Sequence, residues 1–269
     1  MRRRSVVFGL LLLGACSERP PAAGSWADLD ASRPDGGLTV GGLATGGGGG
    51  GGGGGTTTPP PDCGARVLVI FDRSGSMALE WETGAGASPR WRVASDALYD
   101  ALEPLADRLT VGALMFPTGE VPEPGVCATV LPIEDQVSFR DGPAFLTRWE
   151  AMWRAGRVGG STPLDPAFRR ADEALPFDDD TTAVVVLTDG MPTCAEPTTA
   201  WDYAAEWERR GVSTWVVGLP GVGGTSLLDR VAAAGGTGAV LPVDDPTALT
   251  DALSDIVGEA VEQACLATP

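Results

Sequence analysis

The chain has 269 residues and a formal net charge of -17, and its 19 basic residues are all arginine, because the sequence contains neither lysine nor histidine. This composition excludes Ser-His-Asp and Cys-His nucleophile pairs, histidine-ligated zinc, the phosphate-binding lysine of a P-loop and a lysine Schiff base. An acidic surface also repels nucleic acid and anionic lipid, so we expect no nucleic-acid partner for the folded part of the chain.

Residues 1–15 resemble a bacterial export signal. Arginines precede an apolar run from Val6 to Leu13 that is too short to cross a bilayer. The run ends in Leu-Gly-Ala-Cys, which is similar to a lipobox, in which the cysteine, here Cys16, is acylated and becomes the mature N-terminus. The alternative is an ordinary signal peptide that leaves Cys16 as a thiol. From the lipobox we expect a lipid-anchored protein of the bacterial cell envelope. The outer membrane is the favoured location, because Ser17 and not aspartate follows Cys16.

Residues 16–62 have the composition of a flexible tether. Proline, glycine, serine and threonine predominate, and glycine is uninterrupted from Gly46 to Gly55. Such a segment buries too little apolar surface to offset the entropy lost on ordering. The glycines do not form a phosphate-binding loop, because no strand pattern precedes them and no Gly-Lys-Ser/Thr follows. We therefore expect one folded domain over residues 63–266, which is long enough to bury a substantial core.

The sequence from Arg66 to Met77, RVLVIFDRSGSM, predicts a buried strand that ends at a carboxylate. Asp72, Ser74 and Ser76 follow at alternate positions, so their oxygens can turn to one side while Gly75 lets the backbone bend. In an open α/β sheet, ligands bind beside the loops that leave the carboxyl ends of the strands. Taken alone, however, this sequence is more typical of a solvated turn.

The remaining pattern alternates between helix and strand. We predict helices after Ser88, as the N-cap, with Pro89 as first helical residue, and over 139–155, 164–174, 199–210, 226–234 and 246–261, and strands over 109–116, 128–133, 182–188, 212–218 and 238–241. Pro132 suits a strand at the edge of a sheet. Alternation of this kind predicts an α/β fold in which a doubly wound, mainly parallel six-stranded sheet carries helices on both faces.

Two further loops bring oxygen ligands to the same predicted edge. GGSTPL, from Gly159 to Leu164, places Thr162 before a helix, and VVVLTDGMP, from Val184 to Pro192, places Asp189 at the end of a strand. Each has a simpler explanation, since Thr162 could cap the helix and Asp189 could belong to a turn. Hydroxyl and carboxylate oxygens suit Mg²⁺, Mn²⁺ or Ca²⁺ better than zinc or copper. Their occurrence in order favours a metal site.

These motifs together resemble a von Willebrand factor type A domain with a complete metal-ion-dependent adhesion site. The resemblance covers Cys63 to Cys265 and implies a Rossmann-like fold whose edge strand, residues 128–133, is antiparallel. It also implies a set of five metal-binding residues: Asp72, Ser74, Ser76, Thr162 and Asp189. Asp178, Asp179 and Asp180 precede a strand and so lie at the opposite edge. We interpret them as a solvated turn and not as a calcium site.

The leading hypothesis for function is a binding or adhesion module and not an enzyme. The resemblance implies that a divalent cation, with Mg²⁺ favoured over Ca²⁺ or Mn²⁺, takes up an aspartate or glutamate carboxylate of a protein or envelope partner. The membrane is contacted through the N-terminal lipid only. Two alternatives are a phosphoester hydrolase that uses the metal and a carboxylate, and a structural envelope protein in which the metal only stiffens loops.

Four cysteines remain beside Cys16, and in an exported chain we expect them to form disulfides. Cys63 precedes the first strand and Cys265 ends the last helix, so both are predicted at the edge opposite the metal. Cys127 and Cys194 lie in loops on the metal edge. This arrangement predicts the pairs Cys63 with Cys265 and Cys127 with Cys194.

Overall fold

The computed structural model describes residues 63–84, 86–118, 127–154, 158–177, 182–222 and 226–267. The predictions for the export signal with Cys16, for the tether and for Asp178 to Asp180 lie outside these residues. None of the helices in the described part is long and apolar enough to span a bilayer.

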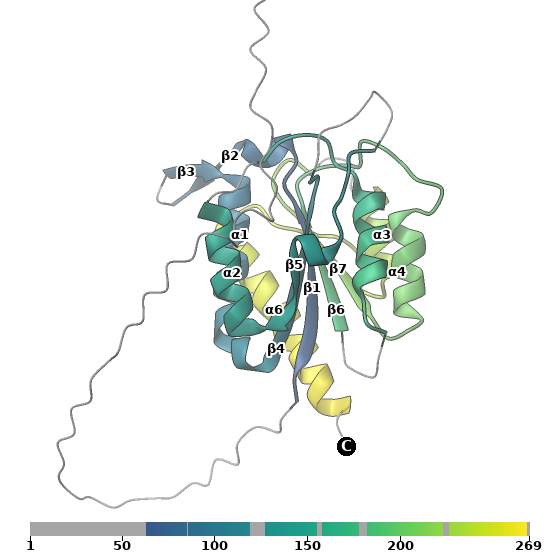
Figure 1. Cartoon of the computed structure of the whole chain (residues 1–269). Coiled ribbons are helices and arrows are strands. Elements are labelled where there is room, and N and C mark those ends of the chain that lie inside the picture. Colours follow the sequence, from purple (N-terminus) through teal and green to yellow (C-terminus); the bar gives the residue numbers. More distant parts are fainter. Residues whose placement is uncertain are drawn as a thin grey trace, which may run out of the picture. The chain divides into compact units, whose positions relative to one another are not determined.

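A six-stranded sheet runs through the centre of the domain (Figure 1). Its strands, in chain order, are β1 (Ala65–Asp72), β4 (Leu109–Phe116), β5 (Val137–Asp141), β6 (Thr182–Thr188), β7 (Ser213–Gly218) and β8 (Leu241–Pro242). The order across the sheet is β5-β4-β1-β6-β7-β8. Only the β4–β5 pair of this sheet is antiparallel. A mainly parallel sheet of this order places the carboxyl ends of β1 and β6, which are neighbours, at one edge.

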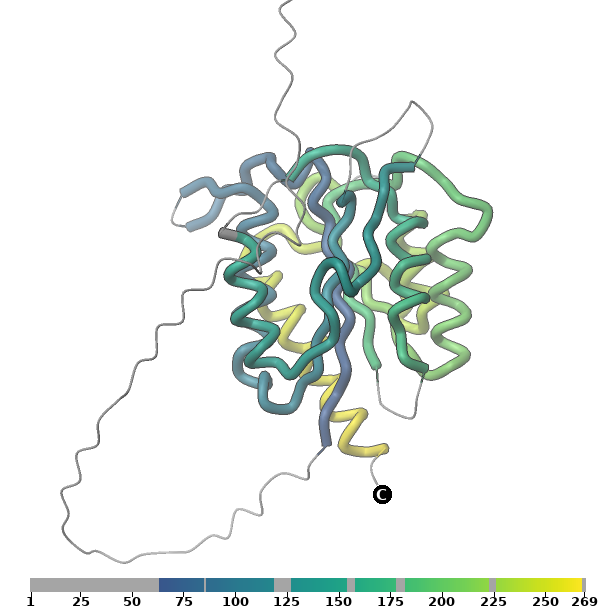
Figure 2. The backbone as a smooth tube through the Cα atoms, viewed as in Figure 1, coloured from purple at the N-terminus to yellow at the C-terminus, as the bar shows by residue number. Residues whose placement is uncertain are grey.

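Helices cover both faces of the sheet, as the tube in Figure 2 also shows. They are α1 (Arg90–Leu102), α2 (Gly142–Arg154), α3 (Leu164–Ala174), α4 (Ala200–Glu208), α5 (Ser226–Ala234) and α6 (Pro246–Ala267). Short 3₁₀ helices occur at η2 (Gly75–Ala78), η3 (Glu103–Arg108) and η4 (Ile133–Asp135). In Figure 1, α1, α2 and α6 lie on one side of the sheet and α3 and α4 on the other.

Side chains of β1 are buried on both faces, which explains its continuous apolar run. Ile70 belongs to a cluster that includes Phe168 of α3 and Trp207 of α4, whose rings stack 5.1 Å apart. Phe71 points to the other face, where its ring lies 5.3 Å from that of Trp149 in α2. Burying a large apolar side chain stabilises a fold by about 1.5–3 kcal/mol. A strand fixed from both sides holds the loop that follows it in place.

The predicted fold class is confirmed, and so are the bounds of β4, α3, β6 and α5. Other ends differ by a few residues, as where α4 begins one residue later because Thr199 and Asp202 form a capping box. The last strand is shorter than predicted, and α6 continues to Ala267.

The predicted edge strand over 128–133 is wrong. Residues 127–132 form no strand, and the antiparallel edge strand is β5, whose last residues, 139–141, fall at the start of the helix predicted over 139–155. Beside this end of β4, the Met115 N–H donates to Oε1 of Gln136 at 2.6 Å, so a side-chain amide stands where a strand was expected. The helix begins only at Gly142, because Oδ1 of Asp141 caps it by accepting from the Ala144 N–H at 3.0 Å.

Ser88 and Pro89 do not begin the first helix as predicted. They belong to β3 (Gly86–Pro89), which pairs with β2 (Glu80–Thr83) in an antiparallel hairpin, and α1 starts at Arg90. The hairpin is fixed by Trp81, which is buried and donates from Nε1 to the Asp244 carbonyl at 3.1 Å. That contact joins residues 163 positions apart, so no local pattern indicates it.

Candidate metal centre

The first loop places three oxygen-bearing side chains directly after β1. Asp72 is the last residue of the strand and is fully buried, and η2 begins at Gly75. The Ser74 N–H donates to Asp72 Oδ1 at 2.7 Å, and the hydroxyls of Ser74 and Ser76 lie 3.1 Å apart. The alternation of Asp72, Ser74 and Ser76 therefore brings their oxygens to one side, as the sequence predicts.

The third loop meets the first through a direct hydrogen bond. Asp189 follows β6 and is 2% exposed. Its Oδ1 accepts from the Ser76 hydroxyl at 2.6 Å. One residue earlier, the Thr188 hydroxyl donates to Asp72 Oδ2 at 2.6 Å. Because β1 and β6 are adjacent parallel strands, their ends bring the two carboxylates to neighbouring positions.

The second loop supplies Thr162, which is 5% exposed. A Cβ placed on Gly190 would lie 3.7 Å from Thr162 Oγ1 and 3.8 Å from Ser76 Oγ, so these hydroxyls face the same point. The Gly75 N–H donates to the Gly160 carbonyl at 3.0 Å and ties the second loop to the first. Thr162 does not cap α3, whose N-cap is Pro163 without a side-chain hydrogen bond. The simpler explanation for Thr162 is therefore not supported.

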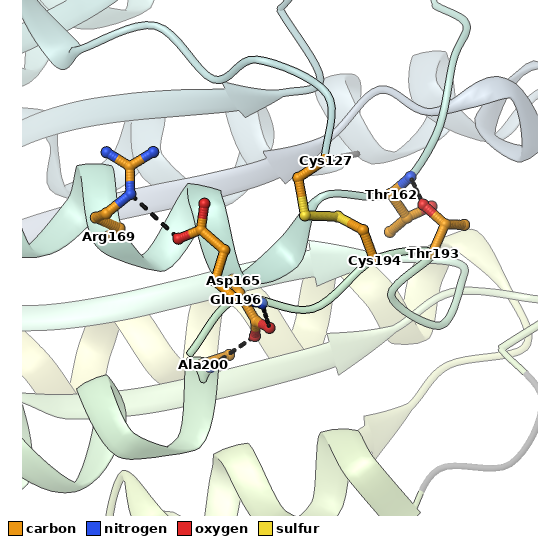
Figure 3. Close-up of a disulfide and its surroundings, with 8 residues drawn as sticks. All are labelled: Cys127, Thr162, Asp165, Arg169, Thr193, Cys194, Glu196 and Ala200. Carbon is orange, nitrogen blue, oxygen red and sulfur yellow. Dashed lines mark hydrogen bonds and ion pairs between the residues drawn. A yellow bond between two sulfur atoms is a disulfide. The ribbon is translucent and has the colours of Figure 1, made fainter. Parts of the chain in front are cut away.

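A disulfide joins the segment between β4 and η4 to the third loop, next to the residue that contacts the second loop. Cys127 and Cys194 are bonded, with Cα atoms 5.3 Å apart, which confirms the predicted pair. Next to Cys194, Thr193 exchanges two hydrogen bonds with Thr162: its Oγ1 accepts from the Thr162 N–H at 2.9 Å and its N–H donates to the Thr162 carbonyl at 3.1 Å (Figure 3). The disulfide thus reaches the Thr162 backbone through one intervening residue.

Asp165 fixes the same region from α3. It is 4% exposed, and its two carboxylate oxygens accept from the N–H groups of Ala200 at 2.8 Å and Glu196 at 3.0 Å (Figure 3). Both of its oxygens are therefore occupied by backbone donors of the segment that follows Cys194. Asp165 therefore stabilises this loop, and neither of its oxygens is directed to the centre.

The two carboxylates of the centre differ in their neighbours. Burial raises the pKa of Asp72 from 3.8 to about 7, although the hydrogen bonds from Thr188 and Ser74 oppose this rise. Asp189 instead pairs with Arg90, whose Nη1 lies 2.7 Å from Asp189 Oδ2. In the same loop as Asp72, burial lowers the pKa of Arg73 to about 10, which leaves its guanidinium charged at neutral pH.

The residues present fit a divalent cation. Five side chains from three loops offer only hydroxyl and carboxylate oxygens, the donors that hard cations prefer. The buried Asp72 carboxylate accepts hydrogen bonds from the Ser74 N–H and the Thr188 hydroxyl, which are both neutral, and an uncompensated buried charge is costly. A cation at this point would supply the missing positive charge. Whether these five side chains bind it stays a prediction.

Four residues that support the centre were not among the sequence predictions: Thr188, Thr193, Asp165 and Arg90. Thr188 is a polar residue at the end of an otherwise apolar strand, next to Asp189, and that pattern could have indicated it. Nothing in the sequence points to Arg90, because it lies 99 positions from its partner.

The centre is distinct from a cavity of about 470 Å³ between α1 and α2. That cavity is lined by aromatic and charged residues, among them Trp91, Trp149 and Asp96, and none of the five candidate residues lines it.

No protein-family model and no curated protein matches this sequence. Its structure is similar to BatB from Bacteroides thetaiotaomicron, with 17% identity and a TM-score of 0.53 over 74% of this chain and 100% of that one. It is also similar to the pilus adhesin SpaC from Lactobacillus rhamnosus GG, with 13% identity and a TM-score of 0.54 over 75% of this chain and 30% of that one.

A third similar structure is proximal thread matrix protein 1 from the mussel byssus, described with a zinc-occupied MIDAS motif. It has 17% identity and a TM-score of 0.50 over 77% of this chain and 47% of that one. At such low identities the similarity concerns the fold. The chain has the fold of a von Willebrand factor type A domain.

Proposed function

We propose that this protein is an exported, lipid-anchored binding module that takes up a divalent cation and through it holds an acidic group of a protein partner. The observation that carries the proposal is the convergence of oxygen-bearing side chains from three loops on one edge of the sheet. The zinc-occupied MIDAS motif of the similar mussel protein supports a divalent cation.

The five side chains have two roles in this proposal. Ser74, Ser76 and Thr162 would contact the cation through neutral hydroxyls, while Asp72 and Asp189 balance its charge from buried positions. A bound cation would supply an electrophilic site for an anionic oxygen, because hydroxyl ligands donate no negative charge. Oxygen ligands alone favour Mg²⁺, with Ca²⁺ and Mn²⁺ as alternatives.

The partner proposed here presents an aspartate or glutamate. With a formal net charge of -17, the protein repels acidic surfaces, so a cation is needed to hold a carboxylate against it.

The hydrolase alternative is less well supported. A carboxylate nucleophile needs an accessible oxygen, but Asp72 is fully buried and both of its oxygens accept hydrogen bonds, from Ser74 and Thr188. The similar structures reported above include a pilus adhesin and a byssus matrix protein. We therefore propose a protein without enzymatic activity. Hydrolysis of a phosphate ester by the purified protein with Mg²⁺, lost in Asp72→Ala, would contradict this.

Cation binding is the first experiment. Calorimetric titration with Mg²⁺, Mn²⁺, Ca²⁺ and Zn²⁺ should show one site in the wild type and none in Asp189→Ala. The matched control is Asp251→Ala, which removes an exposed carboxylate from α6, an element that contributes no residue to the three loops. Equal binding by wild type and Asp189→Ala would refute the assignment of the site.

Partner binding is the second experiment. A pull-down from envelope extract should recover the partner with Mg²⁺ but not with EDTA or with Asp189→Ala. Amidation of the carboxylates of the recovered partner should abolish its binding as EDTA does. Recovery that survives both EDTA and Asp189→Ala would favour the structural alternative, in which the metal only stiffens loops.

The proposed anchor is tested separately. If Cys16 is acylated, Cys16→Ala should move the protein from the detergent-requiring membrane fraction to the soluble fraction, because each buried methylene of a lipid chain contributes about 0.8 kcal/mol. An unchanged distribution between the fractions would exclude the lipid anchor at Cys16 without affecting the cation site.

A further inference from the structure

Arg90 contacts the candidate metal centre from outside the three loops. It is the first residue of α1, and its N–H donates to the Leu79 carbonyl at 3.0 Å, which fixes the start of the helix beside the first loop. Its Nη1 lies 2.7 Å from Asp189 Oδ2. The Arg90 side chain is 13% exposed and that of Asp189 is fully buried, so this ion pair is largely shielded from water.

The loop after β7 is shaped around the same guanidinium. Gly221 has a φ of +98°, and a Cβ at this position would lie 2.7 Å from Arg90 Nη1 and 2.9 Å from Nη2. Only glycine both adopts this backbone conformation easily and leaves room for the arginine. The loop is anchored to the centre, because the Leu219 N–H donates to the Thr188 carbonyl at 2.9 Å. The Arg90 guanidinium therefore lies between Asp189 and the loop that follows β7.

The charges around the centre give this arrangement a consequence. Asp72 and Asp189 carry two negative charges when ionised, which a divalent cation balances. Arg90, which contacts Asp189 directly, adds one positive charge. Charges a few ångströms apart in a partly buried site interact strongly, because water and salt screen them little. Arg90 therefore repels the cation and attracts an anion that approaches it.

We infer that Arg90 is a fixed second cation of this centre, which weakens binding of the divalent cation and strengthens binding of the anionic ligand. The inference rests on the proposed function and assigns one residue two effects of opposite sign. Arg90 also occupies Asp189 Oδ2, while Ser76 occupies Oδ1, so it positions the carboxylate before any cation arrives. A residue with a merely structural role would change both affinities in the same direction.

The test compares Arg90→Met with Arg92→Met. Arg92 lies two positions further along α1, is exposed and places its guanidinium over the Trp91 ring at 5.3 Å, so its removal changes the net charge equally without touching the centre. Calorimetric titration gives the affinity for Mg²⁺. Water-proton relaxation of the Mn²⁺-loaded protein, titrated with acetate, gives the affinity for a carboxylate as acetate displaces water.

Arg90→Met should bind Mg²⁺ roughly five- to tenfold more tightly than the wild type and acetate roughly five- to tenfold more weakly, since it loses one nearby positive charge. Arg92→Met should resemble the wild type in both titrations. Arg90→Lys, which keeps the charge, should restore both affinities toward the wild type. Gly221→Ala is a second variant, because its Cβ displaces the guanidinium without altering the charge. It should change both affinities in the same directions as Arg90→Met.

The inference is overturned if Arg90→Met and Gly221→Ala lower both affinities together, or if Arg90→Met behaves as Arg92→Met does. Those outcomes leave the proposed function intact, because the wild type still binds the cation and acetate. Absence of Mg²⁺ and Mn²⁺ binding by the wild type would instead refute the proposed function and this inference with it.

Discussion

The two edges of the sheet are each closed by a disulfide, but their surroundings differ. At the amino ends of the strands, Cys63 and Cys265 join the start of β1 to the last turn of α6, as predicted, with Cα atoms 5.0 Å apart. Cys63 is 4% exposed and Ala65, two residues further along the chain, is 2% exposed. At the carboxyl ends, Cys127 and Cys194 are bonded next to loops whose polar side chains are buried.

The distribution of buried polar groups makes this difference quantitative. Among the described residues, ten polar or charged side chains are buried, and six of them lie at the carboxyl edge: Asp72, Ser74, Thr162, Asp165, Thr188 and Asp189. Buried polar groups cost free energy unless they are paired. An edge that only closed a core would not concentrate them. This concentration of buried polar groups supports the proposed binding site at the carboxyl edge.

Removing ligands from the carboxyl edge should have the largest effect. Asp72→Ala, Thr162→Ala and Asp189→Ala should each abolish measurable cation binding, since each removes one of the five proposed metal-binding side chains. The strands behind them stay buried, so the far-ultraviolet circular dichroism spectrum should be unchanged. Calorimetric titration with Mg²⁺ provides the measurement, and Thr147→Ala, an exposed threonine on α2, is the control for the threonine variant. Full binding by any of the three variants would remove that residue from the site.

Removing each disulfide separates the two edges directly. Replacement of Cys63 and Cys265 by alanine opens a loop of 202 residues and should lower the free energy of unfolding by on the order of 5 kcal/mol in the chain-entropy account. Replacement of Cys127 and Cys194 opens 67 residues and should cost on the order of 4 kcal/mol. Urea unfolding measures both changes.

The cation affinity should respond only to the disulfide at the carboxyl edge. Loss of the Cys127 bond frees Thr193, which is hydrogen-bonded to Thr162, and loss of such supporting contacts typically costs about tenfold or more in metal affinity. Loss of the Cys63 bond should leave the affinity unchanged. An equal effect of the two replacements on Mg²⁺ binding would show that the edges are not independent.

The same contrast explains how much the sequence could predict. The ends of adjacent parallel strands meet at one edge, so three motifs in order were sufficient to place Asp72, Ser76 and Asp189 near one another, and the structure joins Ser76 to Asp189 by a hydrogen bond. The disulfide pairs followed from the same assignment of loops to edges and are confirmed.

The sequence could not predict features that depend on distant contacts. The hairpin of β2 and β3 depends on Trp81, whose partner Asp244 follows β8. The edge strand was misplaced because Gln136, a side chain, takes the hydrogen bond expected from a strand. Arg90 reaches Asp189 because α1 begins beside the first loop, where the Arg90 N–H donates to the Leu79 carbonyl. Each of these is a tertiary contact that local propensity does not encode.

The pH dependence of the metal-free protein should reveal the buried Asp72. Its pKa is raised from 3.8 to about 7 by burial, so the folded state binds this proton more tightly than the unfolded state does. The contribution of this proton to the stability of the fold is fully present below the pKa of Asp72 in the unfolded chain. It is lost as the pH rises through the pKa of Asp72 in the folded protein. The loss should be on the order of 4 kcal/mol between about pH 4 and about pH 8.

The measurement is urea unfolding in EDTA across this range, with Asp72→Asn as the comparison. The variant carries no titrating group at position 72, so the difference in unfolding free energy between it and the wild type should change with pH. At the higher pH, Mg²⁺ should restore the unfolding free energy that the wild type loses. If this difference stays constant with pH, the charge of the Asp72 carboxylate is already balanced in the metal-free protein.

Replacing Thr188 by valine should have the smallest effect and separates support of Asp72 from cation binding. Valine has nearly the same shape but cannot donate to Asp72 Oδ2, a hydrogen bond of 2.6 Å. A buried carboxylate that loses one donor should cost about 1–3 kcal/mol in the metal-free protein. Because Thr188 is not one of the five candidate ligands, Mg²⁺ should still bind, and saturating Mg²⁺ should recover part of the loss. Thr214→Val is the matched control, since Thr214 is also a buried threonine in a neighbouring strand but lies at the amino end of β7. If Thr188→Val abolished Mg²⁺ binding while Thr214→Val did not, Thr188 would have to be counted among the ligands, and the set of five would be incomplete.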